Sequence, residues 1–176
     1  SASFCMAIGN NYTTLTGFAE KWNGLGWSKV TAPPASAGFD GISCVSPAYC
    51  VALGSTSSGQ SASDIWNGKT WSVQLFPNAT FYPNDISCVS SSFCMAAGGG
   101  AAVTDVWNGG SWSAVAVPVP FASISCVSAT SCEAAGVIDQ LDGVVSFAGW
   151  NGTTWQAQAA PANLNWDEYF RTSCAS

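Results

Sequence analysis

The side chains that could do chemistry in this sequence are carboxylates and indoles, because the 176 residues include no histidine. Without histidine, neither a Ser-His-Asp nor a Cys-His arrangement can activate a nucleophile. A pair of carboxylates could still hydrolyse a glycosidic bond by acid and base catalysis. The acidic side chains are Glu20, Asp40, Asp64, Asp85, Asp105, Glu133, Asp139, Asp142, Asp167 and Glu168.

Three of these acids recur at one position of an internal repeat, two residues before a tryptophan. They are Glu20, Asp64 and Asp105, and the fourth repeat has Ala148 at this position. Because equivalent positions of successive repeats lie on different structural units, we do not expect these carboxylates to meet at one bond. We therefore predict that they act as hydrogen-bond acceptors or stabilise turns, and that the protein is a binding module rather than an enzyme.

Tryptophan offers a second kind of chemistry, a flat apolar face for a sugar ring. The motif Trp-Asn-Gly-x-x-Trp occurs four times, at 22–27, 66–71, 107–112 and 150–155. We predict that the second indole of each copy stacks on a sugar while the nearby acid accepts a hydroxyl proton. These indoles belong to Trp27, Trp71, Trp112 and Trp155. In the alternative, which stays open here, the paired indoles pack on each other or between sheets as core.

A further candidate site lies outside the repeat, at Trp166 and Asp167. An aromatic ring beside two successive carboxylates, Asp167 and Glu168, could hold a ligand at a junction between repeats. The same segment could instead cover the junction as a lid. The sequence is compatible with both interpretations.

Eight cysteines form four copies of one spacing, and the fourth copy is divided between the two ends of the chain. We predict the disulfides Cys44–Cys50, Cys88–Cys94, Cys126–Cys132 and Cys5–Cys174. The alternative is zinc, which usually requires closer cysteine pairs and histidine partners. We predict no metal and no cofactor. An even set of paired cysteines is typical of an oxidising compartment, so we expect a secreted protein.

Composition excludes several classes of partner. The net charge is -6 and only 8% of residues are charged, so the chain has no basic surface for nucleic acid. No apolar run approaches the ~20 residues that a membrane-spanning helix needs. A chain that begins at Ser1 is consistent with a mature form after removal of a leader.

The elements that position these side chains repeat about every 43 residues. Each unit contains Ile-Ser-Cys-Val-Ser or a variant of it, then Cys-x-Ala-x-Gly, then the tryptophan motif. Asn-Gly is a strong hairpin signal, and a period of this length with tryptophan turns is typical of four-stranded propeller blades. We predict one all-β domain over 1–176, a four-bladed β-propeller of four-stranded antiparallel blades.

The divided cysteine motif predicts how the ring closes. Residues 169–176 would supply the first strand of the blade that 1–33 completes, and Cys5–Cys174 would tie the two ends together. Closure removes an exposed sheet edge that otherwise invites aggregation. One alternative stays open, in which two four-unit chains pair to make an eight-bladed ring.

The combination Ser-Cys-x-Ser-x-x-x-Cys-x-Ala-x-Gly followed by Trp-Asn-Gly-x-x-Trp resembles tandem repeats of secreted bacterial proteins, notably from actinobacteria. The resemblance covers essentially the whole chain and implies a secreted, cysteine-rich repeat propeller. The Trp-Asn-Gly hairpins are also similar to those of propeller lectins, in which sugars lie between blades against tryptophan faces. That similarity implies carbohydrate binding without chemistry.

We therefore predict a secreted, disulfide-stabilised binding module with repeated sites between blades, for glycans or cell-surface polysaccharide. Repeated sites would make binding multivalent. The second hypothesis is a structural or adhesive subunit of an extracellular assembly, which would self-associate. The third, and least supported, is an enzyme acting on glycosides.

Overall fold

The computed structural model describes residues 3–11, 13, 16–33, 38–99, 102–139, 144–160 and 172–175. These residues form fifteen strands in four antiparallel sheets, and no helix. Sheet A contains β1 (Cys5–Asn11), β2 (Thr16–Trp22) and β3 (Trp27–Val30). Sheet B contains β4 (Phe39–Ser46), β5 (Tyr49–Ser55), β6 (Ser61–Trp66) and β7 (Trp71–Leu75). Sheet C contains β8 (Tyr82–Ser90), β9 (Phe93–Gly99), β10 (Val103–Trp107) and β11 (Trp112–Ala116). Sheet D contains β12 (Ser123–Ser128), β13 (Ser131–Asp139), β14 (Val144–Trp150) and β15 (Trp155–Gln158).

An Asn-Gly turn closes the last hairpin of every sheet, as the sequence predicts. The glycines of these turns are Gly24, Gly68, Gly109 and Gly152. Their φ angles lie between 94° and 99°, a region that glycine adopts without strain. In the second turn, the Asn67 Oδ1 accepts the backbone N–H groups of Lys69 and Thr70, at 3.0 and 2.9 Å. The turn sets Trp66 directly opposite Trp71, with ring centroids 5.2 Å apart.

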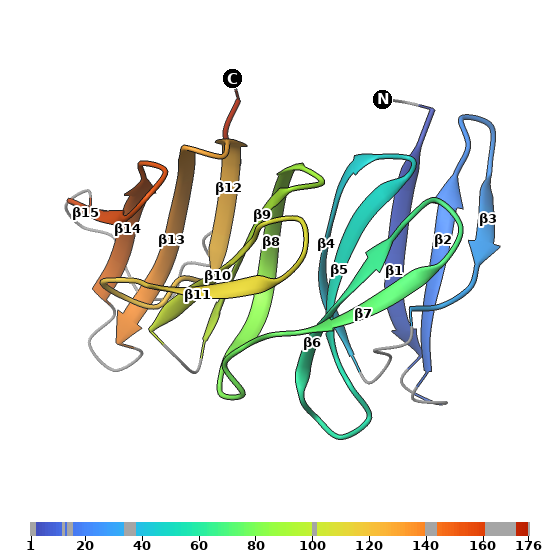
Figure 1. Ribbon diagram of the computed structural model, residues 1–176, viewed down its shortest axis with the longest axis horizontal. Helices are drawn as coiled ribbons and strands as arrows, with labels where there is room; N and C mark the ends of the chain where they lie inside the picture. The colour runs from blue at the N-terminus through green and yellow to red at the C-terminus, as the bar shows by residue number, and fades with distance from the viewer. Residues whose placement is uncertain are drawn as a thin grey trace.

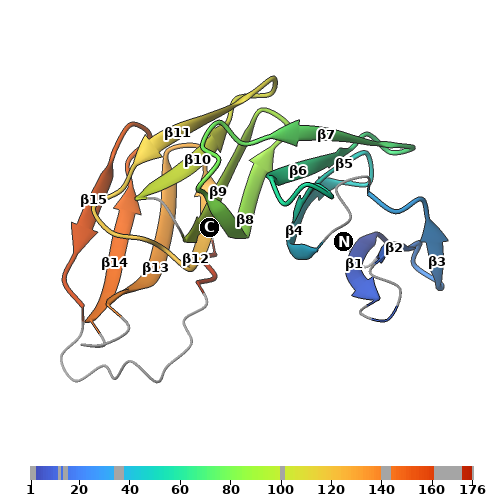
Figure 2. The ribbon, with the colours of Figure 1, turned by 90° about the horizontal axis from the view of Figure 1, so that it is seen from below.

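The four sheets stand side by side in an open arc, in the order A, B, C, D (Figures 1 and 2). Along its concave side the first strands of successive sheets, β4, β8 and β12, are neighbours. Both chain ends lie on this side, the N-terminus at sheet A and the C-terminus beside β12 (Figure 2). The arrangement is that of an all-β, propeller-like fold. Among the described residues no helix is long and apolar enough to cross a membrane.

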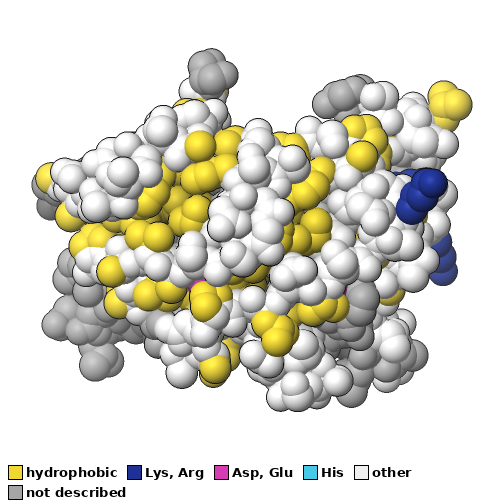
Figure 3. All heavy atoms as spheres, in the orientation of Figure 1, with side chains coloured by type: hydrophobic (Ala, Val, Ile, Leu, Met, Phe, Trp, Pro, Cys, Tyr) yellow, Lys and Arg dark blue, Asp and Glu magenta, His cyan; other side chains and the backbone are white. Residues whose placement is uncertain are grey.

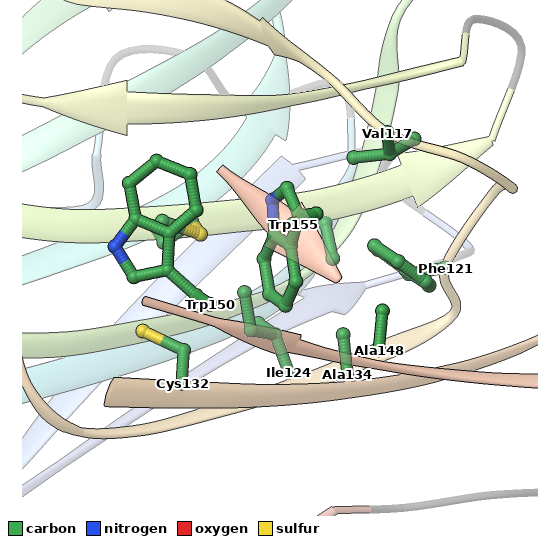
Figure 4. Close-up of a cluster of buried hydrophobic side chains, with 10 residues drawn as sticks. Val117, Phe121, Ile124, Cys132, Ala134, Ala148, Trp150 and Trp155 are labelled. Atoms are coloured by element: carbon green, nitrogen blue, oxygen red, sulfur yellow. The ribbon is translucent and has the colours of Figure 1, made fainter. Parts of the chain in front are cut away.

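Apolar side chains fill the space between each pair of neighbouring sheets. Between sheets C and D, Ile124, Cys132, Trp150 and Trp155 belong to one cluster (Figure 4). Met95 of sheet C packs in the same cluster. Equivalent clusters lie between sheets B and C and between sheets A and B. Because the side chains of a strand alternate between its two faces, each inner sheet contributes to two clusters. The core is therefore a series of inter-sheet layers.

The predicted closed ring is not present in the structure. The arc is open between sheets A and D, and Cys5 and Cys174 are exposed and form no disulfide (Figure 2). Sheet A has three strands, as predicted for the N-terminal part of its blade, but residues 172–175 lie beside β12 at the other end of the arc. Sheets B and C stand between the two ends, so the two cysteines cannot meet in this arrangement.

Candidate functional site

Three of the four tryptophans predicted to bind sugar are part of the core. Trp71, Trp112 and Trp155 are 7–9% exposed. The indole Nε1 of Trp112 donates to the Ser63 Oγ at 2.8 Å, and that of Trp155 donates to the Thr104 Oγ1 at 3.0 Å. In both cases the acceptor belongs to the preceding sheet. These indoles join neighbouring sheets and offer no face to a ligand, so the prediction of a binding site at each of them is wrong.

Trp71 also joins two neighbouring sheets through its indole N–H, but the acceptor is different. Its Nε1 donates to the backbone carbonyl of Thr31 at 2.9 Å, across the junction of sheets A and B. By repeat position, Ala19 stands in sheet A where Ser63 and Thr104 stand in sheets B and C. Because alanine has no acceptor, the indole bonds to the backbone instead.

Trp27 differs from its three counterparts because it lies at the free end of the arc. It is 51% exposed, and its ring centroid lies 5.9 Å from that of Trp22. Glu20 pairs with Lys29 across the same hairpin, and Phe18, two residues before Glu20, is also exposed. We call the surface formed by Phe18, Glu20, Trp22, Trp27 and Lys29 the end face of sheet A. The basic side chains visible in Figure 3 lie at this end of the molecule.

The acids at the repeated position are also buried within the arc but partly exposed at its end. Asp64 and Asp105 are completely buried between sheets, whereas Glu20 lies on the end face. In the described part of the chain, neither carboxylate oxygen of Asp105 has a hydrogen-bond partner. Burial raises the pKa of Asp105 from 3.8 to about 6. The predicted role of Asp64 and Asp105 as ligand acceptors is therefore wrong, because a buried carboxylate cannot reach a ligand on the surface.

The remaining predicted site, Trp166 and Asp167, lies outside the described residues. Among those that are described, no group of three acidic or cysteine side chains could hold a metal ion. One acid that the sequence did not single out has a clear structural role. The Asp85 Oδ2 accepts the Ser123 hydroxyl at 2.8 Å and the Ile124 N–H at 2.9 Å, which joins sheets C and D.

Three of the four predicted disulfides are confirmed. They are Cys44–Cys50, Cys88–Cys94 and Cys126–Cys132, and each joins residues directly opposite each other on the first two strands of a sheet. They indicate an oxidising environment. The fourth pairing, Cys5–Cys174, is not formed.

A set of contacts that sequence reasoning missed joins the first strands of neighbouring sheets. The backbone N–H of Cys88 donates to the Ser43 Oγ at 3.0 Å, and that of Cys126 donates to the Ser87 Oγ at 2.9 Å. The signal was present in the sequence, because serine precedes the first cysteine of every unit. A repeated serine beside a repeated cysteine is easily taken for a turn residue.

No family model and no curated protein matches this chain. Among solved structures, the chain is similar to a propeller described as YCF48 bound to D1 peptide, with a TM-score of 0.54 and 16% sequence identity. The match covers 88% of this chain and 45% of that one. At this identity the similarity shows the fold alone. The chain therefore spans less than half the length of the propeller it resembles.

Proposed function

We propose that this protein is a secreted binding module that associates with a polypeptide partner through sheet A, as a subunit of an extracellular assembly. The observation that carries this proposal is that sheet A is incomplete. Its β1 occupies the place of the second strand of the other sheets, and no described strand pairs with the outer edge of β1. The end face of the same sheet exposes Trp27 and Phe18.

An unpaired edge strand recruits another strand by offering its free backbone N–H and C=O groups. On the end face, Cys5, Ala7 and Gly9 are the residues of β1, and the ring of Phe18 lies over Gly9. The exposed aromatic rings would add apolar contact beside the new strand. Main-chain bonds would supply affinity, and the end face would supply selectivity.

The similar structure supports a polypeptide as the ligand class. That propeller is described as bound to a peptide, and we apply this class of ligand to the present chain. The three disulfides suit a binding module that works outside the cell. The proposal includes no catalytic step.

Carbohydrate binding is the second candidate, supported by the exposed indole of Trp27 beside Glu20. An indole face and a carboxylate suit the C–H and O–H groups of a sugar. Because the three equivalent indoles are buried, a single chain would bind sugar at one site of this kind and not at four. Avidity would then require several chains.

One experiment compares the two candidates. The monomeric protein, its Trp27→Ala variant and a matched Leu75→Ala variant, each isolated as a monomer, are applied to an array of extended octapeptides and to a glycan array. Leu75 is an exposed apolar residue on the last strand of sheet B, so it controls for the loss of surface hydrophobicity. We expect peptide binding that Trp27→Ala reduces at least tenfold and Leu75→Ala leaves unchanged. Sugar binding with the same dependence would replace the proposal with the second candidate, and no binding to either array would refute both.

A further inference from the structure

The first strands of successive sheets are joined by a hydrogen bond that recurs along the arc. Cys88 of sheet C donates its backbone N–H to the Ser43 Oγ of sheet B, and Cys126 of sheet D donates to the Ser87 Oγ of sheet C. The distances are 3.0 and 2.9 Å. This bond therefore identifies a segment that lies as a first strand beside the first strand of the preceding sheet.

Residues 172–175 make the same bond at the end of the arc. The backbone N–H of Cys174 donates to the Ser125 Oγ of sheet D at 3.0 Å. Two residues earlier, the N–H of Thr172 donates to the Ser123 Oγ at 2.8 Å, at the position where Ile124 donates to Asp85 one sheet before. The segment 172–175 is thus placed as the first strand of a fifth sheet whose other strands are missing from the described chain.

Sheet A lacks this strand and keeps the register that would receive it. Cys5 of β1 lies opposite Trp22, as the second cysteine of each other unit lies opposite the first tryptophan of its motif. In those sheets the first cysteine lies opposite the second, with Cα atoms 3.9–4.0 Å apart. A strand 172–175 added to β1 in the same register would place Cys174 opposite Cys5, and both thiols are exposed and unbridged.

We propose that the strand is supplied by a second copy of this chain. Two copies would exchange residues 172–175 head to tail, so that each completes sheet A of the other and the two arcs close into one ring of eight sheets. The inference rests on the proposed function, and it identifies the polypeptide partner as a second copy of this chain. A repeated head-to-tail contact closes when the rotation between units completes a circle.

The faces brought together fit the inter-sheet layers already present. Trp27 would become buried against sheet D of the partner, as Trp155 is buried against sheet C. Glu133 on the far side of sheet D stands at the position of Met95 and faces the new layer, where Lys29 provides an opposite charge. Glu20 would enter the same layer at the position where Asp105 is already buried between sheets B and C.

Closure would end in a disulfide between Cys5 of one copy and Cys174 of the other. The two thiols give up two protons and two electrons as the S–S bond forms. A small-molecule disulfide accepts them and is reduced to two thiols. Two such bonds form for each pair of chains, related by the two-fold axis.

Complementation between single-cysteine variants tests the exchange directly. Cys5→Ser and Cys174→Ser are each oxidised alone and then mixed in a buffer of reduced and oxidised glutathione, and the mass and disulfide map are measured without reduction. Both positions are exposed, so neither substitution should disturb folding. We expect a species of twice the 18.1 kDa chain mass, containing a Cys5–Cys174 peptide, only in the mixture. The unmodified protein should show the same mass with two such bonds.

Three other results would contradict the inference, and each has a different consequence for the proposed function. A Cys5–Cys174 bond within a single chain would show that the chain completes its own sheet A, and it would overturn the proposed function as well. A monomer with both thiols free, which still binds peptides through Trp27, would overturn only the second copy as partner. A ladder of masses above the dimer would exclude the two-membered ring.

Discussion

Replacing Asp105 with asparagine should make the protein more stable at neutral pH and remove a pH dependence. Asp105 is completely buried between sheets B and C, and burial raises its pKa from 3.8 to about 6. An acid with a raised pKa holds its proton more tightly in the folded state. The free energy of unfolding therefore falls as pH rises from about 3.8, and the loss is complete above about 6.

The size of this loss follows from the pKa. One pKa unit corresponds to about 1.36 kcal/mol, so the shift from 3.8 to about 6 sets an upper limit of about 3 kcal/mol. Water penetration and local relaxation reduce the cost of the charge, and we expect roughly 1–3 kcal/mol at pH 7. The buried amide of asparagine has a desolvation cost of its own, but that cost does not change with pH.

Urea unfolding at pH 4, 5, 6 and 7, with the disulfides intact, measures the effect. The difference in unfolding free energy between Asp105→Asn and the unmodified protein should grow with pH and level off near pH 7. Burial also raises the pKa of Asp40, but this contribution is common to both proteins and cancels. Glu20→Gln, at the same repeat position on the end face, is the matched control for the change from a carboxylate to an amide. A difference that stays constant from pH 4 to pH 7 would refute the argument.

Three further predictions concern the contacts that hold the sheets. Ser87→Ala removes the acceptor of the Cys126 N–H, and urea unfolding should show a loss of about 1–3 kcal/mol; an unchanged midpoint would contradict the role of the serine. Trp155→Ala should cost about 3–5 kcal/mol in the same assay, whereas Trp27→Ala should cost less than about 1 kcal/mol in the single chain; equal losses would show that Trp27 is buried. Gly68→Ala, at a φ of 94°, should lower stability by about 1–2 kcal/mol, and a neutral result would argue against the Asn-Gly turn.

Local signals in the sequence predicted the hairpins and the cysteine pairs that close within one sheet. An Asn-Gly turn fixes which residues lie opposite each other, so the pairing of Trp66 with Trp71 and of Cys44 with Cys50 follows from spacing alone. The closed four-bladed ring did not follow, because the number of sheets in a ring depends on the rotation between neighbouring sheets. That rotation is set by packing between sheets, which a repeat motif does not record.

The prediction of a binding site at every second tryptophan was wrong for a related reason. A tryptophan on the surface and a tryptophan between sheets satisfy the same motif, since both need one aromatic residue after an Asn-Gly turn. Exposure depends on whether a neighbouring sheet is present, and among the four tryptophans that follow an Asn-Gly turn, all of them described, Trp27 alone lacks one. The useful signal was instead the hydroxyl acceptor in the preceding repeat, three residues before the first tryptophan of its motif. Ser63 and Thr104 carry a hydroxyl for the next indole, and that pairing could have identified Trp112 and Trp155 as core.

The junction between two copies would differ from the junctions within a chain. At the repeat position of Ser63 and Thr104, sheet D carries Phe147, whose side chain cannot accept a hydrogen bond from the Trp27 indole. The new junction would lack one buried bond that fastens sheet B to C and sheet C to D. The Cys5–Cys174 bond would compensate at the concave side, since it would cross from one chain to the other, whereas each disulfide within the arc joins strands of one sheet. Covalent closure is therefore needed most at the junction where the non-covalent contacts are weakest.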